Sequence, residues 1–528
     1  MFHFLGTMDL FQNPIPSTSG FVDELEKILQ TWENPLEGIV AEVTIENDIL
    51  SDRDLLGIFF EEDPLSIAVE QTGWTIGNPS RESQNLFEFR GEPGLKVNLG
   101  DHPVDYFRAV MTNTCFETLI RCTNDYGNRL KSHATGSARA VTWKNVSIQE
   151  MELFLGLLFH MGFVKLNRIV DYWKKDILFH QPIFYKKKMA RNRFQLILRS
   201  LNVQTVQSTT SYEKVRWILD FFNNKMYEIY YPKKNLVIDE SMMLWKGRLK
   251  FRQYVKGKRH KHGLKIYMLA DQLGIACRIH LYGGSADNLV GGTNHVKKVV
   301  LHLLGNYKNM GHSLFIDNFY TSVALSGQLQ AIEVYSTGTL NNRRLKLAGS
   351  NVWKDKREIM ALSNKYNAEF IETRNRRGQV KCKPNMIAQY TKHMKSVDHH
   401  DQMMAYYSCE HKSLIWYKKV IIHLLEIMII NAYLLYRADI RHNITLYDFK
   451  LSVIKSLLSY DFELSLPLTS RVHLPSNLPK DDRDHTKRRR CAQCWKVAKK
   501  RVQSIFFCND CLEKPGLCIG CFREYHRY

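Results

Sequence analysis

The sequence has no run of about 18 uncharged apolar residues, the length that a helix needs to cross a lipid bilayer. Its most apolar segment, residues 420–435, contains His423 and Glu426, which favours a buried helix of the core. The first ten residues lack the basic start and the apolar run of a secretory signal peptide. We therefore expect a soluble, intracellular protein with no membrane partner. In a reducing compartment, clustered cysteines indicate metal binding before disulfides.

Acidic residues are outnumbered in this chain. The 53 Asp and Glu face 74 Lys and Arg, so the formal net charge is +21 and the isoelectric point is near 9.4. Such an excess favours binding to a polyanion, most often nucleic acid, although ribosomal, membrane-surface and heparin-binding proteins share it. Hydrophobic residues at 44% exclude a disordered chain, and 528 residues exceed one ordinary core. Several domains are expected.

The first third of the chain changes from acidic to helical in character. Residues 1–90 are rich in Asp and Glu and predict a largely disordered acidic arm. Farther on, Ser147 and Glu150 have the spacing of a helix capping box before an apolar run that ends near residue 163. Residues 191–201 and 212–230 repeat apolar side chains at helical spacing. The segment from 91 to 235 is therefore predicted to be helical.

A mixed α/β pattern begins at residue 236. Strands are predicted at residues 235–239, 263–271, 276–282, 313–317 and 334–340, and helices at 295–304 and 322–331. This order indicates a mixed sheet with helices packed on it. Residues 367–374 are typical of an edge strand, and helices are predicted from 386 to about 460. A charged, proline-containing linker then leads to a cysteine-rich tail.

Four aspartates stand out in this pattern. Asp239 and Asp317 each end an apolar strand, where side chains would project from the sheet edge into solvent. Asp398 and Asp401 are three residues apart, which puts both on one face of a helix. If that helix packs beside the strand ends, the carboxylates converge and repel one another unless a hard divalent cation such as Mg²⁺ neutralises them.

Two such ions about 3.5–4 Å apart can activate a water or a 3′-OH and stabilise the leaving oxygen in phosphoryl transfer. Each aspartate alone also has an ordinary explanation, because strand-end aspartates cap turns and helical ones are usually solvated. Asp271 and Glu240 are nearby alternatives. We interpret Asp271 as a turn residue, and strand alternation directs Glu240 to the opposite face from Asp239.

The segments around these aspartates resemble the piggyBac transposase family. Three blocks carry the resemblance: DESMMLWKG from Asp239 followed by KIY at 265–267, FIDNFYTS at 315–322, and YTKHMKSVDHHDQ at 390–402. Upstream, FRGEPGL at 89–95, DYF at 105–107 and TN at 123–124 are also similar to the family. The resemblance covers roughly residues 86 to 528.

The resemblance implies an α/β fold class: an RNase H-like mixed-sheet catalytic core with a β-rich insertion, flanked by an all-helical DNA-binding and dimerisation domain. A small zinc-binding cross-brace domain ends the chain. The implied boundaries are 1–90 for the arm, 91–235 and 409–465 for the helical domain, 236–343 and 386–408 for the core, 344–385 for the insertion, 466–490 for a basic linker and 491–528 for the zinc domain.

The implied activity is Mg²⁺-dependent excision at TTAA sites through hairpinned ends, followed by strand transfer by 3′-OH attack. By the resemblance, Asp239, Asp317 and Asp398 hold two Mg²⁺ ions, and Asp401 is a further required acid. The implied partners are double-stranded DNA with terminal inverted repeats and a second copy of the chain, in the nucleus. Trp416 matches a family tryptophan placed against DNA, where stacking on an unpaired base is worth about 1–3 kcal/mol; a core tryptophan is the alternative.

Two departures from the family favour a second hypothesis. Asn341 and Asn342 stand where the family often has an arginine, although Arg343 and Arg344 remain as candidate DNA contacts. The segment between Asp317 and the third block is also shorter than in the family. Both departures are expected in a domesticated, catalytically silent DNA-binding protein derived from a transposase.

The tail contains three C-x2-C pairs and a terminal histidine, which is a zinc pattern. The candidate ligands are Cys491, Cys494, Cys508, Cys511, Cys518, Cys521 and His526. Two tetrahedral Zn²⁺ sites need eight ligands, and an interleaved cross-brace suits so short a segment. The resemblance favours His473 as the eighth ligand, with His485 as the rival.

Other functions for the tail stay open at this point. The resemblance implies a domain that reads transposon ends, and a purely structural zinc knot is the alternative. A RING-type ubiquitin ligase fits the cysteine spacing but leaves the carboxylates unexplained. The basic run before the tail is typical of a nuclear localisation signal or of phosphate contacts. It consists of Lys487, Arg488, Arg489 and Arg490.

Overall fold

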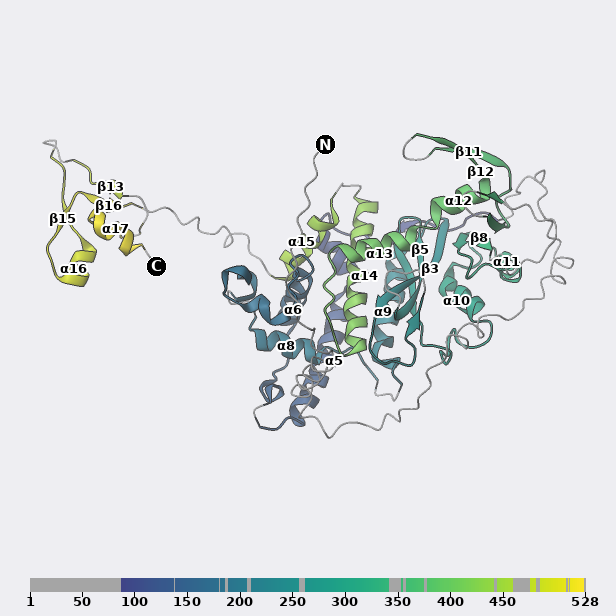
Figure 1. Ribbon diagram of the computed structural model, residues 1–528, viewed down its shortest axis with the longest axis horizontal. Helices are drawn as coiled ribbons and strands as arrows, with labels where there is room; N and C mark the ends of the chain where they lie inside the picture. The colour runs from purple at the N-terminus through teal and green to yellow at the C-terminus, as the bar shows by residue number, and fades with distance from the viewer. Residues whose placement is uncertain are drawn as a thin grey trace, which may run out of the picture. The chain divides into compact units, whose positions relative to one another are not determined.

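The computed structural model describes most of the chain from residue 87 onward (Figure 1). The described residues are 87–458 and 475–526, apart from 137, 180, 186–188, 207–209, 256–261, 341–352, 355–357, 375–377, 441–443, 481–484, 510 and 512. The predicted acidic arm therefore lies outside them except for its last four residues. There, Phe87 donates its N–H to the Tyr335 hydroxyl (2.6 Å) and Arg90 donates its N–H to the Met310 carbonyl (3.1 Å).

Helices account for most of the described residues between 103 and 229, as predicted. The longer helices are α4 (Pro103–Val110), α5 (Asn113–Ser132), α6 (Ile148–His160), α8 (Arg191–Ser200) and α9 (Glu213–Ile229). The predicted N-cap of α6 is confirmed, since the Ser147 side chain accepts the Glu150 N–H at 3.2 Å. The Glu150 carboxylate instead forms an ion pair with Arg193 at 2.5 Å, which joins α6 to α8.

An eight-stranded mixed sheet forms the centre of the second region. Its strands are β3 (Asn235–Leu244), β4 (Gln253–Tyr254), β5 (His262–Asp271), β6 (Ala276–Leu281), β7 (Ser313–Ile316), β8 (Tyr335–Leu340), β9 (Trp353–Lys354) and β10 (Glu358–Ser363). The order is β4-β5-β3-β7-β8-β10-β9, with β6 paired to β5. The pairs β3–β7 and β7–β8 are parallel, and the other pairs are antiparallel. The predicted mixed α/β class is confirmed.

Helix α9 packs on β6 of this sheet, and four later helices pack on it as well. They are α10 (His295–Leu304), α11 (Val323–Ala331), α12 (Asn385–His393) and α13 (Ser396–Tyr406). The helical segment predicted from residue 386 to 407 consists of two helices, α12 and α13. The break places α13 against β3 and β5, while α12 contacts β3, β8 and β10.

The apolar segment around residue 420 is the long helix α14 (Trp416–Asp439). It is long and apolar enough to cross a membrane, but 94% of its most apolar window is buried inside the protein, so it serves as a core helix. Its buried Asn431 accepts the Ala276 N–H (3.0 Å) and donates to the Ala276 carbonyl (2.8 Å) at the start of β6. The helix α15 (Leu446–Leu457) packs on α4 and α6.

The segment predicted as an insertion contributes to two sheets. Strand β10 pairs with β8 and extends the main sheet. The strands β11 (Phe370–Arg374) and β12 (Val380–Pro384) form a separate antiparallel ribbon, which leads directly into α12 (Figure 1).

The cysteine-rich tail has its own small core. It consists of Cys491, Cys508, Leu517 and Phe522. Two short strand pairs and two helices surround it: β13 (Pro475–Asn477) with β16 (Phe506–Cys508), β14 (Arg489–Arg490) with β15 (Gln503–Ser504), α16 (Ala492–Ala498) and α17 (Ile519–Tyr525).

Candidate nuclease and zinc sites

Asp239 and Asp317 lie side by side on neighbouring parallel strands. Ile238 on β3 is in register with Ile316 on β7, and the residue that follows each of them is an aspartate. The expected strand end at Asp239 is wrong, because β3 continues to Leu244. The reason is that β5 pairs with β3 along its whole length, whereas β7 stops at Ile316. Asp239 is accordingly buried, at 7% exposure, rather than projecting into solvent.

Helix α13 packs on β3 and β5 and brings two more carboxylates to this part of the sheet. It carries both Asp398 and Asp401. The Ser241 hydroxyl donates to Asp401 Oδ1 at 2.6 Å. Since Ser241 is two residues beyond Asp239, both side chains lie on the same face of β3. The helix is thereby held against the face that carries Asp239.

Tyr390 on α12 lies close enough to the three proposed ligands for the charge of each to affect its hydroxyl. Burial raises the pKa of its hydroxyl to about 12, and the carboxylates of Asp317, Asp239 and Asp398 act in the same direction. One phenol therefore feels all three charges. Asp317 follows Asp239 by 78 residues and Asp398 follows Asp317 by 81, yet all three carboxylates act on this one side chain.

Asp317 itself begins a tight turn after β7. Its Oδ1 accepts the Phe319 N–H at 3.0 Å, and its carbonyl accepts the Tyr320 N–H at 3.2 Å. Burial raises the pKa of the Asp317 carboxyl to about 6, with a further contribution from the negative charge of Glu240. The turn fixes the side chain, and its surroundings disfavour an isolated negative charge there.

Glu240 lies on the reverse face of β3, as strand alternation predicted. It accepts the Tyr320 hydroxyl at 3.1 Å and lies 3.9 Å from the Lys265 ammonium. The other alternative, Asp271, is the turn residue that the sequence indicated. It is fully buried and accepts the Tyr230 hydroxyl and the Leu273 N–H, at 2.6 and 2.8 Å.

The acidic edge suits a hard cation by its donor set. It offers carboxylate oxygens, the ligands that Mg²⁺ prefers. Burial and the negative charge of Glu240 raise the pKa of Asp317, and a bound cation would favour its ionised form. Within the described part of the chain, three or more metal-ligand side chains meet within 4.8 Å in two places, and both are in the cysteine tail. The aspartates line one edge without meeting at that distance.

The remaining candidate DNA contacts are placed unevenly. Trp416 is the first residue of α14, is 9% exposed, and packs edge-on against Phe251 with ring centroids 5.2 Å apart. The core role therefore describes Trp416 in this structure. Arg343 and Arg344 lie outside the described residues.

The basic run before the tail is exposed throughout. Lys487 and Arg488 precede β14, and Arg489 and Arg490 form that strand. Arg490 lies over the Trp495 ring, 4.3 Å from its centroid. Two of the four predicted basic contacts thus belong to the zinc domain itself.

The tail cysteines separate into two groups in an interleaved order. One group is Cys491, Cys494, Cys518 and Cys521, and the other is Cys508, Cys511 and His526. The first and third C-x2-C pairs share one site while the middle pair joins the terminal histidine, which is the predicted cross-brace. The sulfur atoms of Cys494 and Cys521 are 3.4 Å apart, and Cys511 Sγ lies 3.3 Å from His526 Nε2.

Local contacts prepare these groups for zinc. Burial alone would raise the pKa of Cys491, but the N–H groups of Cys494 and Cys518 outweigh it and lower that pKa to about 7. His526 Nδ1 lies 2.7 Å from the Phe522 carbonyl, which turns Nε2 toward Cys511. His473 lies outside the described residues, and His485 is exposed and belongs to neither group.

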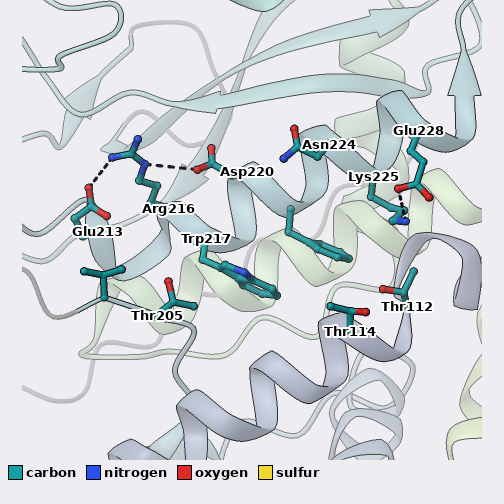
Figure 2. Close-up of a pocket in the computed structure, with 12 residues that line it drawn as sticks. Thr112, Thr114, Thr205, Glu213, Arg216, Trp217, Asp220, Asn224, Lys225 and Glu228 are labelled. Atoms are coloured by element: carbon teal, nitrogen blue, oxygen red, sulfur yellow. Dashed lines mark hydrogen bonds and ion pairs between the residues drawn. The ribbon is translucent and has the colours of Figure 1, made fainter.

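A separate groove of about 850 Å³ lies on the helical region (Figure 2). Trp217 and Phe221 on α9 stack along it with ring centroids 5.3 Å apart. Ion pairs on α9, including Arg216 with Glu213 (2.9 Å), border the ring pair. None of the four aspartates lines this groove.

Comparison with known proteins identifies relatives over most of the chain. A family model described as "Transposase IS4" matches residues 102–352 and 351–433, and one described as "DDE_Tnp_1-like zinc finger" matches 471–527. Human PiggyBac transposable element-derived protein 3 is 22% identical over 471 residues, covering 80% of this chain and 76% of its own. Human PiggyBac transposable element-derived protein 5 is 21% identical over 418 residues, covering 71% and 78%.

A solved structure has the same fold. It is a piggyBac transposase in a synaptic complex with hairpin DNA, with a TM-score of 0.60 and 20% identity over 81% of this chain and 98% of that chain.

Proposed function

Because the chain belongs to the piggyBac transposase family, we propose that it is a Mg²⁺-dependent DNA transposase of the Asp-only type. The supporting observation is the adjacency of Asp239 and Asp317 in the β3–β7 register, with α13 held against the same face by the Ser241–Asp401 hydrogen bond. Asp239, Asp317 and Asp398 would hold the cations. Such ions activate an attacking oxygen and stabilise the leaving oxygen at a DNA phosphate.

The chain's own residues supply the positioning. The Phe319 N–H orients the Asp317 carboxylate, and the Ser241 hydroxyl orients that of Asp401. Tyr390 on α12 lies near the same carboxylates. Its pKa is about 12, so its phenol stays protonated at neutral pH. Because this phenol is neutral, it does not add to the negative charge of the carboxylates, which repels a DNA phosphate.

The proposed substrate is double-stranded DNA carrying terminal inverted repeats, excised from and inserted at TTAA. A chain with net charge +21 is suited to such a polyanion. We further propose that the protein acts as a homodimer in the nucleus, where the exposed basic run from Lys487 to Arg490 would serve for import or phosphate contact.

The cysteine groups support two Zn²⁺ ions, with seven of eight ligands already gathered. We propose His473 as the eighth. Pro475, two residues beyond it, is paired with Cys508 across β13 and β16, so the chain runs beside the three-ligand group at this point. His485 lies next to Thr486, which pairs with Lys480 instead.

The decisive experiment is a cleavage assay with the purified full chain, Mg²⁺ and the terminal repeats that flank its gene. The proposal expects nicked ends in the native protein and none in Asp317→Ala. Glu369→Ala, a substitution in the connection to β11, is the control and should leave cleavage intact. Cleavage that survives in Asp317→Ala contradicts the proposal.

The second candidate is a domesticated DNA-binding protein that no longer cuts DNA. The human relatives are named as transposable element-derived proteins, which favours it. Specific binding of the terminal repeats without nicking in the same assay would support this candidate.

A further inference from the structure

Glu240 is a buried carboxylate that is not among the proposed metal ligands. Its side chain is 10% exposed and faces away from Asp401, on the reverse side of β3. Its Oε2 accepts the Tyr320 hydroxyl at 3.1 Å, and Tyr320 is fully buried. Burying a carboxylate costs folding free energy. We therefore expect either that the contacts of Glu240 offset this cost or that Glu240 is kept for a role in the site.

Its contacts lead directly to the turn that carries Asp317. The Tyr320 side chain donates to Glu240, while the Tyr320 N–H donates to the Asp317 carbonyl at 3.2 Å. The neighbouring Phe319 N–H donates to the Asp317 carboxylate. Glu240 is therefore joined through one side chain to the backbone that orients Asp317.

Lys265 on β5 contacts the same turn through the Phe319 ring. Its ammonium lies 3.9 Å from Glu240, 4.3 Å from the centroid of the Phe319 ring and 4.7 Å from that of the Tyr267 ring. A cation held over two rings beside a carboxylate is fixed in place. Two residues of the turn after Asp317 are therefore held by side chains on this face of the sheet: Phe319 by Lys265 and Tyr320 by Glu240.

We propose that Glu240 is a positioning residue for divalent-cation binding: through Tyr320 it holds the turn that presents Asp317 beside Asp239, and its charge strengthens cation binding without contact to the ion. This inference rests on the proposed function. A fixed negative charge behind a cluster of ligands raises the affinity for a cation. Residues that orient metal ligands from outside commonly contribute about 10- to 100-fold in metal affinity.

The test is a Mn²⁺ titration of the zinc-loaded full chain, followed by electron paramagnetic resonance of the free ion. Glu240→Gln keeps the shape and can still accept from Tyr320, so the midpoint of thermal unfolding should change little. Its Mn²⁺ affinity should nevertheless fall by about 10- to 100-fold. Tyr320→Phe keeps the charge and removes the hydrogen bond, and should weaken Mn²⁺ binding several-fold by loosening the turn.

Tyr172→Phe is the matched control, because it also removes the hydroxyl of a fully buried tyrosine, one that donates to the Val164 carbonyl at 2.7 Å in the helical region. Its Mn²⁺ affinity should equal that of the native protein. Unchanged affinity in both Glu240→Gln and Tyr320→Phe overturns the inference.

Asp239→Ala separates this inference from the proposed function. If it leaves Mn²⁺ binding intact, the proposed metal site is wrong and the role of Glu240 fails with it. If it abolishes binding while Glu240→Gln does not weaken it, only the role of Glu240 is wrong. Should Glu240→Gln fail to fold, Tyr320→Phe decides by the same titration.

Discussion

Ser241 and Asp401 are joined by a 2.6 Å hydrogen bond across 160 residues of sequence, and this bond links β3 to α13. The donor belongs to the strand that carries Asp239, and the acceptor belongs to the helix that carries Asp398. The relative position of the proposed ligands therefore depends on one hydroxyl as well as on packing.

Replacing Ser241 with Ala tests this link. A hydrogen bond to a charged group is worth about 1.5–3 kcal/mol, so the variant should lose up to that much stability in chemical denaturation. In the cleavage assay, kcat should fall while KM for DNA stays unchanged, because the substitution disorders Asp401 and not the DNA-binding surface. Ser241→Thr retains the hydroxyl and should recover most of kcat. A raised KM for DNA with an unchanged kcat would contradict the role assigned to Ser241.

The raised pKa of Asp317 predicts a pH-dependent cost to the metal-free fold. Its pKa in the folded protein is about 6, against an ordinary value of 3.8. The folded state thus prefers the protonated form, so the stabilisation is complete below pH 3.8 and is lost as the pH rises through 6. In magnesium-free buffer, Asp317→Asn should be more stable than the native protein at pH 7, by up to about 3 kcal/mol.

The comparison of urea unfolding at pH 7 and pH 4 measures this effect. The advantage of Asp317→Asn should shrink at the lower pH, where the native carboxyl is largely protonated. Asp448→Asn, at the first turn of α15, is the control and lies far from the acidic edge in sequence. An advantage of the same size at both pH values contradicts the predicted titration.

Trp416 should matter for stability before it matters for DNA. Because it is 9% exposed and packs on Phe251, Trp416→Ala should cost about 3–5 kcal/mol of unfolding free energy. Trp416→Phe should recover most of that loss. If Trp416→Ala instead unfolds like the native protein and loses only affinity for DNA with unpaired bases, the stacking role holds and the core role does not.

The Asn431 side chain should hold α14 to β6. Its two hydrogen bonds satisfy both backbone groups of Ala276 in a fully buried position. Asn431→Ala leaves these groups without their amide partner, and each should cost about 1–3 kcal/mol. Calorimetry should show a large drop in the melting temperature, whereas Asn224→Ala on the exposed face of α9 should have little effect.

Zinc content tests the ligand assignment of the tail. The native chain should carry two zinc ions by elemental analysis. Cys494→Ser should empty one site, and His473→Ala should reduce the second, while His485→Ala should leave both filled. Cys382→Ser, at an exposed cysteine of the β11–β12 ribbon, should also retain two ions. Loss of zinc in His485→Ala but not in His473→Ala would reverse the assignment.

Much of the fold could be predicted because it is local. The apolar periodicities of residues 191–201 and 212–230 became α8 and α9, and the apolar runs before Asp239 and Asp317 became β3 and β7. The C-x2-C spacing pointed to zinc because two residues between cysteines suit one tetrahedral ion. In each case neighbouring residues alone set the pattern.

Other features depended on distant partners. The length of β3 beyond Asp239 is set by pairing with β5. The break between α12 and α13 lets α13 pack on β3 and β5 while α12 also reaches β8 and β10. The buried state of Trp416 follows from Phe251, 165 residues earlier. No local pattern in the sequence carries this information.

The sequence by itself indicated four aspartates and a cysteine tail as the candidate sites, because residue type and spacing decide which ions can bind. Only the tertiary structure decided that Asp239 and Asp317 share a register, that Glu240 is joined through Tyr320 to the turn after Asp317, and that the cysteine pairs interleave. Those relations come from strand pairing and side-chain packing between segments far apart in the chain, and burial also sets the pKa of Asp317.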